Sequence, residues 1–278
     1  MTITTDLDYY MNDDLISLLD LTIKRQKRKW DNLLVVDGEE RGGKTTMVKT
    51  MAYYIAWKKK QHISLKNFFF DPQELLKFAI STEEQIIVWD EAAFGGLSTS
   101  WQSKMQQKLC TMLMVTGKYR HTYIFIIPSF FRLNRYMALD RSSGLIHIYS
   151  PDMLSRGSFT CYNRSQKTWI YNSYRKSETY GKVNSFRGQF TLKNTQNIID
   201  EVEYEKKKDE AIHKFLNKVE VKDNQKLLQL QYNIATKLPT NIGMEVANVC
   251  RNTIYDWKKH NMAPVEVLPD IKDIAISN

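Results

Sequence analysis

The segment Gly38-Glu39-Glu40-Arg41-Gly42-Gly43-Lys44-Thr45 separates a short apolar run, residues 32–37, from a stretch with helical character, residues 45–58. Its spacing is G-x-x-x-x-G-K-[ST]. In this pattern the glycines let backbone N–H groups point inward around a phosphate, the lysine reaches the β- and γ-phosphates, and the hydroxyl binds Mg²⁺. The N-terminus of the following helix adds the positive end of its dipole. The segment therefore predicts a strand, a phosphate-binding loop and a helix.

We expect ATP as the ligand and Mg²⁺ as its metal ion. The residues predicted to hold the nucleotide are Gly38, Arg41, Gly42, Gly43, Lys44, Thr45 and Thr46, and Thr45 is also a predicted metal ligand. Glu39 and Glu40 stand inside this anion-binding loop. Because backbone groups form the cradle, we expect both side chains to point outward, where they either keep the loop solvated or pair with a neighbouring subunit.

A second apolar run, residues 85–91, ends in Asp90 and Glu91. Ligands of open α/β sheets bind at the carboxyl ends of the strands, so these acids are expected beside the glycine loop. Asp90 is the predicted metal ligand, and Glu91 the predicted base that orients and deprotonates water. The alternative is a strand that ends in a solvated acidic turn.

Apolar runs alternate with helical stretches as far as residue 150, which predicts a parallel sheet of βαβ units. Strands are expected at 32–37, 67–71, 85–91, 123–129 and 144–150, and helices at 13–30, 45–58, 72–81, 101–115 and within 132–141. Residues 157–181 alternate aromatic and polar residues without a helical stripe, which predicts a hairpin or irregular strands. Residues 198–221 are predicted to form a charged, exposed helix.

Several basic residues follow or precede these strands, and we expect them near the same edge: Lys118, Arg120, Arg132, Arg135 and Arg141. A ring ATPase needs an arginine of one subunit at the γ-phosphate of the next, to stabilise the charge of the transition state. Arg135 and Arg141 are the first candidates and Arg120 the next. The alternative is that these arginines bind DNA phosphates or solvate helices.

Residues 242–261 predict two short helices joined by a tight turn, with Ile254 and Trp257 packing inward from the second helix. Such a helix-turn-helix places its second helix in the major groove of DNA. The predicted DNA-facing residues are Arg251, Asn252, Thr253, Tyr255, Lys258 and Lys259. The alternative is a helical unit that docks on another protein.

The whole chain carries a formal net charge of +9, which favours a polyanionic partner. Its three cysteines are far apart and lack CxxC spacing, which argues against disulfides or a zinc site and suits the cytoplasm. The N-terminus lacks the apolar core of a signal peptide, and no apolar run approaches the ~18 residues of a membrane span. We therefore expect a cytoplasmic protein, in the host cytoplasm if the chain is viral, without a membrane span.

Residues 30–150 resemble P-loop ATPases of the FtsK–HerA and zonular-occludens-toxin-like kind, through "GEERGGKT", "IIVWDEAAF" and "GKYRHTYIFIIPSFFRLNRYMALDR". "DEAAF" also resembles large terminases, and the C-terminal unit resembles the helix-turn-helix of recombinases and small terminases. The resemblance implies an α/β, RecA-like sheet of the additional-strand, catalytic-glutamate class, in which the strand of residues 123–127 lies between the other two. Ser129 would then be a sensor of the γ-phosphate.

The expected organisation is an ATPase domain at 1–198, with its core at 30–150 and a β-rich extension at 151–197. A charged helical linker at 199–222, a helix-turn-helix domain at 223–262 and a tail at 263–278 would follow. We expect an oligomeric, DNA-binding ATPase that translocates double-stranded DNA, most plausibly a viral packaging motor that meets a portal or another phage or mobile-element protein. The alternatives are an ATP switch acting in replication, transposition or segregation, and a non-catalytic DNA-binding assembly factor.

Overall fold

The computed structural model describes residues 2–3, 9–90, 99–181, 184–190, 199–214, 232–233, 236, 240, 244 and 251–260. The chain divides into two compact units, Met1–Ala211 and Ile212–Asn278. The first unit is an α/β unit built on a seven-stranded, mostly parallel sheet.

The first five strands of this sheet lie at the predicted places in the sequence, and the last two were predicted only as part of a β-rich extension. They are β3 (Asn32–Gly38), β4 (Phe68–Phe69), β5 (Ile86–Asp90), β6 (Thr122–Ile126), β7 (Gly144–Tyr149), β8 (Ser158–Tyr162) and β9 (Phe186–Gln189). Their spatial order is β4-β5-β6-β3-β7-β8-β9. The five strands β3, β4, β5, β6 and β7 run parallel to one another, whereas β8 and β9 are added antiparallel at one edge. A separate pair, β1 (Thr2–Ile3) and β2 (Tyr9–Tyr10), lies outside this sheet.

Strand β6 lies between β3 and β5, as the resemblance implies. Leu34 of β3 and Val88 of β5 both pair with Ile124 of β6. Strands in the middle of a parallel sheet are buried on both faces, which is why they are continuous apolar runs and not alternating ones. Residues 33–36 and 86–90 are all buried.

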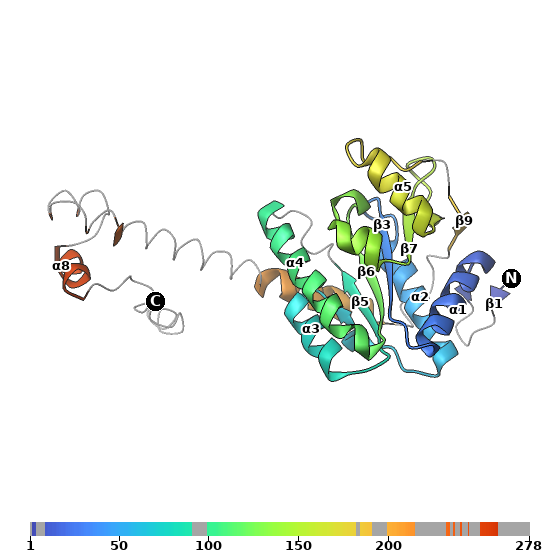
Figure 1. Cartoon of the computed structure of the whole chain (residues 1–278), viewed down its shortest axis with the longest axis horizontal. Coiled ribbons are helices and arrows are strands. Elements are labelled where there is room, and N and C mark those ends of the chain that lie inside the picture. Colours follow the sequence, from blue (N-terminus) through green and yellow to red (C-terminus); the bar gives the residue numbers. More distant parts are fainter. Residues whose placement is uncertain are drawn as a thin grey trace. The chain divides into compact units, whose positions relative to one another are not determined.

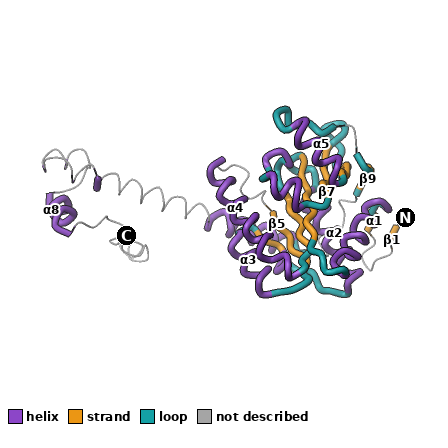
Figure 2. The backbone as a smooth tube through the Cα atoms, viewed as in Figure 1, coloured by secondary structure: helices purple, strands orange, loops and turns teal. Residues whose placement is uncertain are grey.

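Helices cover both faces of the sheet, and Figure 1 shows α1 and α2 on one side with α3 and α4 on the other. Their bounds are α1 (Asp13–Lys27), α2 (Lys44–Lys59), α3 (Pro72–Ser81), α4 (Thr99–Thr116) and α5 (Arg164–Tyr174). Polar N-caps begin three of them, because the Asn12, Asp71 and Asn163 side chains accept backbone N–H groups of the first turn. A π-helical turn, Tyr136–Arg141, takes the place of the helix expected within 132–141. Figure 2 shows the same helices in purple around the orange strands.

The prediction of β structure throughout residues 157–181 is wrong, because α5 follows β8. Asn163 and Gln166 form a capping box that starts the helix. Lys167, Ile170 and Tyr171 are its buried residues, at helical spacing. This stripe is hard to recognise in the sequence because one of its members is a lysine. The buried Lys167 ammonium donates to the Ala138 and Leu139 carbonyl groups at 2.5 and 3.0 Å.

A further helix covers residues 201–214, where a charged helix was expected. Its beginning is not an exposed linker, however. Tyr204 is fully buried, and its ring packs edge-on against Phe68 and Phe70 with centroids 5.9 and 5.3 Å apart. Lys207 donates to the Phe68 carbonyl at 2.6 Å. The aromatic residue therefore attaches an otherwise polar helix to the sheet.

In the second unit the structure describes α8 (Arg251–His260) and a few residues before it. Ile254 is buried, with Met244 and Trp257 packed against it, so the predicted inward packing of this helix is confirmed. The Tyr232 ring lies 5.6 Å from that of Trp257. The predicted tight turn between the two short helices and the tail at 263–278 lie outside the described residues. Among the described helices, none combines the length and apolar character needed to cross a membrane.

Candidate functional site

The glycine loop connects the carboxyl end of β3 to the first turn of α2. Gly38 has φ 127°, and a Cβ there would lie 1.9 Å from the Ile148 carbonyl oxygen of β7. Only glycine allows this backbone conformation and this approach. Glu39 and Glu40 are exposed, as expected of loop side chains outside the cradle, and Arg41, a predicted nucleotide residue, is also exposed. Gly42, which belongs to the same loop, is buried. The loop therefore has its charged side chains exposed and part of its backbone buried.

Lys44 is the first residue of α2 and is buried beneath the loop. Its Nζ donates to the carbonyl oxygens of Gly38 and Glu39 at 2.8 and 2.7 Å. Burial lowers the pKa of Lys44, and the Asp37 and Asp90 carboxylates oppose that shift. A desolvated ammonium held by carbonyl groups is well placed to bind an anion entering the loop.

Thr45 and Asp90 come together across the sheet, as the sequence predicted. Thr45 lies in the first turn of α2 and Asp90 ends β5, and Thr45 Oγ1 lies 3.5 Å from Asp90 Oδ2. Asp90 is fully buried. A hydroxyl and a carboxylate oxygen are the hard donors that Mg²⁺ prefers. Glu91, the predicted base, lies outside the described residues.

A cavity of about 620 Å³ opens beside the loop. It is lined by Glu40, Arg41, Gly43, Lys44, Thr45, Thr46, Pro128, Arg156, Glu201, Glu205 and Lys208. The first N–H groups of α2 have no acceptor within the helix, and at this end of α2 they are next to the cavity. Its size is within the range of small-molecule sites. Most of the predicted nucleotide residues therefore line one hollow.

Asp37, the last residue before Gly38, is the centre of a buried polar cluster. Its carboxylate accepts from the Phe130 backbone N–H at 2.7 Å, from the Tyr180 hydroxyl, and contacts His147 Nδ1 at 3.0 Å. The rings of His147 and Tyr180 stack with centroids 3.5 Å apart. Burial, aided by the Asp37 charge, raises the pKa of Tyr180, which therefore stays a donor. The cluster joins the ends of β3, β6 and β7 beside the loop.

Ser129, the predicted sensor, follows β6 at the same edge. Its hydroxyl donates to Glu178 Oε2 at 3.3 Å, and Arg132 Nε contacts the other oxygen of Glu178 at 3.3 Å. Ser129 is adjacent to Phe130, whose N–H is held by Asp37. Arg135, an arginine candidate, follows β6 and is exposed.

The expectation that Arg120 and Arg141 lie near this edge is wrong. Both precede parallel strands, and so they lie at the amino ends, opposite the loop. Arg120 pairs with Glu83 and Glu84 at 2.9 and 3.0 Å. Arg141 forms an ion pair with Asp31, just before β3. Both arginines therefore join segments at the base of the sheet.

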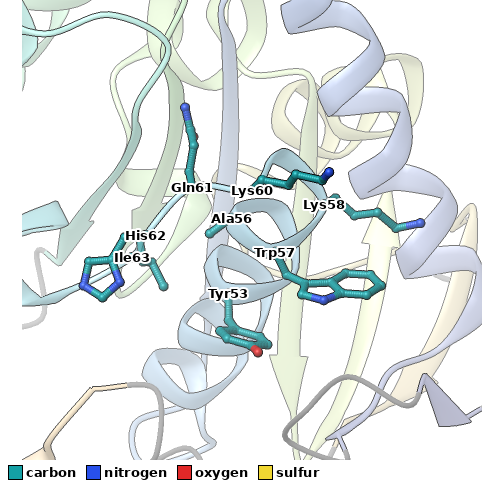
Figure 3. Close-up of a pocket in the computed structure, with 8 residues that line it drawn as sticks. All are labelled: Tyr53, Ala56, Trp57, Lys58, Lys60, Gln61, His62 and Ile63. Carbon is teal, nitrogen blue, oxygen red and sulfur yellow. The ribbon is translucent and has the colours of Figure 1, made fainter.

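Exposed cations gather at that amino end, where the last turns of α1 and α2 also lie. Hydrogen bonds join the segments there: Lys59 donates to the Glu84 carbonyl at 2.6 Å, and Asn32 N–H to the His121 carbonyl at 3.0 Å. The exposed cations are Lys24, Lys27, Arg28, Lys29, Lys58, Lys60 and Lys118. A cavity of about 640 Å³ at the end of α2 contains none of the predicted site residues; Figure 3 shows the Trp57 and Tyr53 rings on its wall.

In the second unit, α8 carries all the predicted DNA-facing residues. Arg251, Asn252, Tyr255, Lys258 and Lys259 are exposed, and Thr253 is half-buried. The buried Ile254 lies on the other face of the helix. The helix is therefore amphipathic, with one buried face and one exposed polar face.

Sequence reasoning missed Asp37, Tyr180 and Tyr204. A charged residue at the end of an apolar run could have pointed to Asp37, because an acid so placed needs buried partners. The Tyr204 hydroxyl donates to Asp90 Oδ2, and no sequence signal links these two residues, which are 114 positions apart.

The chain matches no family model, and no curated protein matches it significantly.

Proposed function

We propose that this protein is a Mg²⁺-dependent P-loop ATPase of the RecA-like, additional-strand class. The observation that carries the proposal is the approach of Thr45 Oγ1 to Asp90 Oδ2 across β6, beside a buried lysine. The Gly38 cradle, the carbonyl-held Lys44 and the oxygen donors of Thr45 and Asp90 all fit a magnesium nucleotide. When bound, Mg²⁺ would neutralise charge on the transferred phosphoryl group.

The residues of the chain have separate roles in this proposal. Lys44 and the N–H groups at the start of α2 bind the phosphates. Asp90 and Thr45 orient the metal, and Glu91 takes a proton from the attacking water. Ser129 contacts the γ-phosphate region from β6. Arg135 is the candidate to act on a neighbouring subunit in a ring, since Arg120 and Arg141 are engaged at the base of the sheet.

We further propose that the ATPase binds double-stranded DNA and translocates it, as a viral genome-packaging motor would. The exposed polar face of α8, the net charge of +9 and the cations at the amino end of the sheet support a polyanionic partner. A DNA-bound switch acting in replication, transposition or segregation has the same residues, and it differs in that it would not move along DNA.

The test is ATP hydrolysis by the full chain with and without duplex DNA. Wild type should be stimulated by DNA, Glu91→Gln should be inactive, and a variant with Arg251, Lys258 and Lys259 changed to Gln should lose the stimulation. Changing Lys66, Lys77 and Lys108 to Gln removes the same charge from exposed positions elsewhere and should retain it. Hydrolysis that is indifferent to DNA would remove the motor proposal. A second assay measures whether the protein displaces a triplex-forming strand from the duplex. A motor that moves along DNA should displace the strand, and a DNA-bound switch should not.

A further inference from the structure

The helix of residues 201–214 contributes one of its faces to the candidate nucleotide cavity. Glu201, Glu205 and Lys208 line the cavity, and Tyr204 lies on the same side of the helix, because residues three and four apart share a face. Three of these side chains thus line the cavity, and the fourth, Tyr204, is fully buried.

Tyr204 contacts the predicted metal ligand directly. Its hydroxyl donates to Asp90 Oδ2 at 2.5 Å. This is the same oxygen that Thr45 Oγ1 approaches at 3.5 Å, so both hydroxyl groups converge on one oxygen of the predicted metal ligand. Asp90 and Tyr204 are both fully buried.

A carboxylate oxygen has about two lone-pair positions. With the phenol on Oδ2 and Thr45 facing it, a metal-bound water has no good approach to that oxygen. The Thr45 hydroxyl can ligate a metal ion through its oxygen and still donate its proton to Asp90. Tyr204 is not expected to ligate the metal ion as Thr45 does. We therefore expect Tyr204, and not Thr45, to release Asp90 when the metal ion binds.

The charges on the same helix also favour the release of Asp90 by Tyr204 when the nucleotide binds. Glu201 and Glu205 would face a triphosphate in the same cavity, and like charges repel there. Glu201 pairs with Lys49 at 2.6 Å, and the Lys49 ammonium lies 4.3 Å from the centre of the Tyr204 ring. The docked helix therefore suits a site without nucleotide.

We propose that Tyr204 is a positioning residue of the metal site: its hydroxyl holds Asp90 while no metal is bound and releases it when the magnesium nucleotide enters. This inference rests on the proposed ATPase function. The phenol supplies the hydrogen bond that a buried carboxylate requires, and the metal shell takes over that task. The helix of residues 201–211 thereby reports whether the site is filled.

The test measures binding of a fluorescent, non-hydrolysable ATP analogue to the full chain, once with Mg²⁺ and once with EDTA. Tyr204→Phe keeps the ring, and Lys207 continues to attach the helix to the Phe68 carbonyl. With Mg²⁺ this variant should bind the analogue about tenfold more tightly, as expected for removing one competing hydrogen bond to a charged group. With EDTA its affinity should equal that of wild type.

The matched control is Tyr54→Phe, because Tyr54 also donates to a carboxylate, that of Asp20 at 2.8 Å, away from the cavity. Its affinity should be unchanged in both conditions. Equal or weaker magnesium-dependent binding by Tyr204→Phe overturns the inference and leaves the ATPase proposal intact. A wild type that does not bind the magnesium analogue overturns both.

Amide hydrogen exchange gives a readout independent of affinity. Adding the magnesium analogue to wild type should accelerate exchange in residues 201–211, since Tyr204 leaves its site. The Tyr54→Phe control should show the same acceleration. Slower or unchanged exchange in these residues would show that the helix stays docked, and would refute the inference.

Discussion

Replacing Gly38 with alanine should both destabilise the protein and disable the loop. The new Cβ would stand 1.9 Å from the Ile148 carbonyl oxygen, which is backbone and cannot rotate away, and the residue would keep φ 127°. Strain in such a conformation costs about 1–3 kcal/mol. Moving the carbonyl would also weaken its hydrogen bond from Glu39 N–H, 3.2 Å long, at about 1 kcal/mol. We expect a total loss of roughly 3 kcal/mol.

Gly144→Ala is the matched control, because Gly144 pairs with Leu34 in the same β3–β7 ladder. Its added Cβ would meet the nearest atoms at 3.7 Å, an ordinary contact, so its stability should change by less than about 1 kcal/mol. Urea unfolding followed by circular dichroism measures the loss of stability of both variants. In thermal unfolding, Tm should fall by roughly 10 °C for Gly38→Ala alone. Equal stability of the two variants would show that the loop relaxes freely, and the reasoning would fail.

Three further outcomes follow from buried charges. Lys44→Met should leave stability unchanged or higher, because burial disfavours the ammonium, while nucleotide binding, measured by titration, weakens by at least about tenfold; a large loss of stability would contradict this. Asp37→Ala should cost roughly 3 kcal/mol in urea unfolding, because it leaves buried donors without their acceptor, and a near-neutral result would argue against the cluster. Burial lowers the pKa of Lys167 to about 8 from 10.5. Between these values the unfolded chain holds the proton and the native chain does not, so this group makes stability rise with pH, by up to about 3 kcal/mol. Lys167→Met should therefore show a smaller rise between pH 8 and 10 than wild type, and identical pH profiles would refute the assignment.

The strand, loop and helix around Gly38 were predictable because each depends on local rules. Helix α3 begins at Pro72 and ends at Ser81, the bounds that its proline and apolar spacing indicate. The position of β6 between β3 and β5 followed from the class resemblance and not from spacing. Helix α5 was missed because its buried stripe contains Lys167, and a lysine is read as solvent-facing unless its carbonyl partners are known.

The sequence by itself determined which residues have the chemistry of a phosphate site, because that chemistry depends on residue type and short spacing: Lys44, Thr45 and Asp90 could be named before any fold was known. The tertiary structure decided which charges reach that site. It placed Arg141 against Asp31 at the far edge of the sheet, and it brought Tyr204 onto Asp90 from a helix that reads as solvated. Such contacts join residues that are far apart in the chain, and no local pattern specifies them. They depend on the order in which the strands assemble into the sheet and on where a distant helix docks.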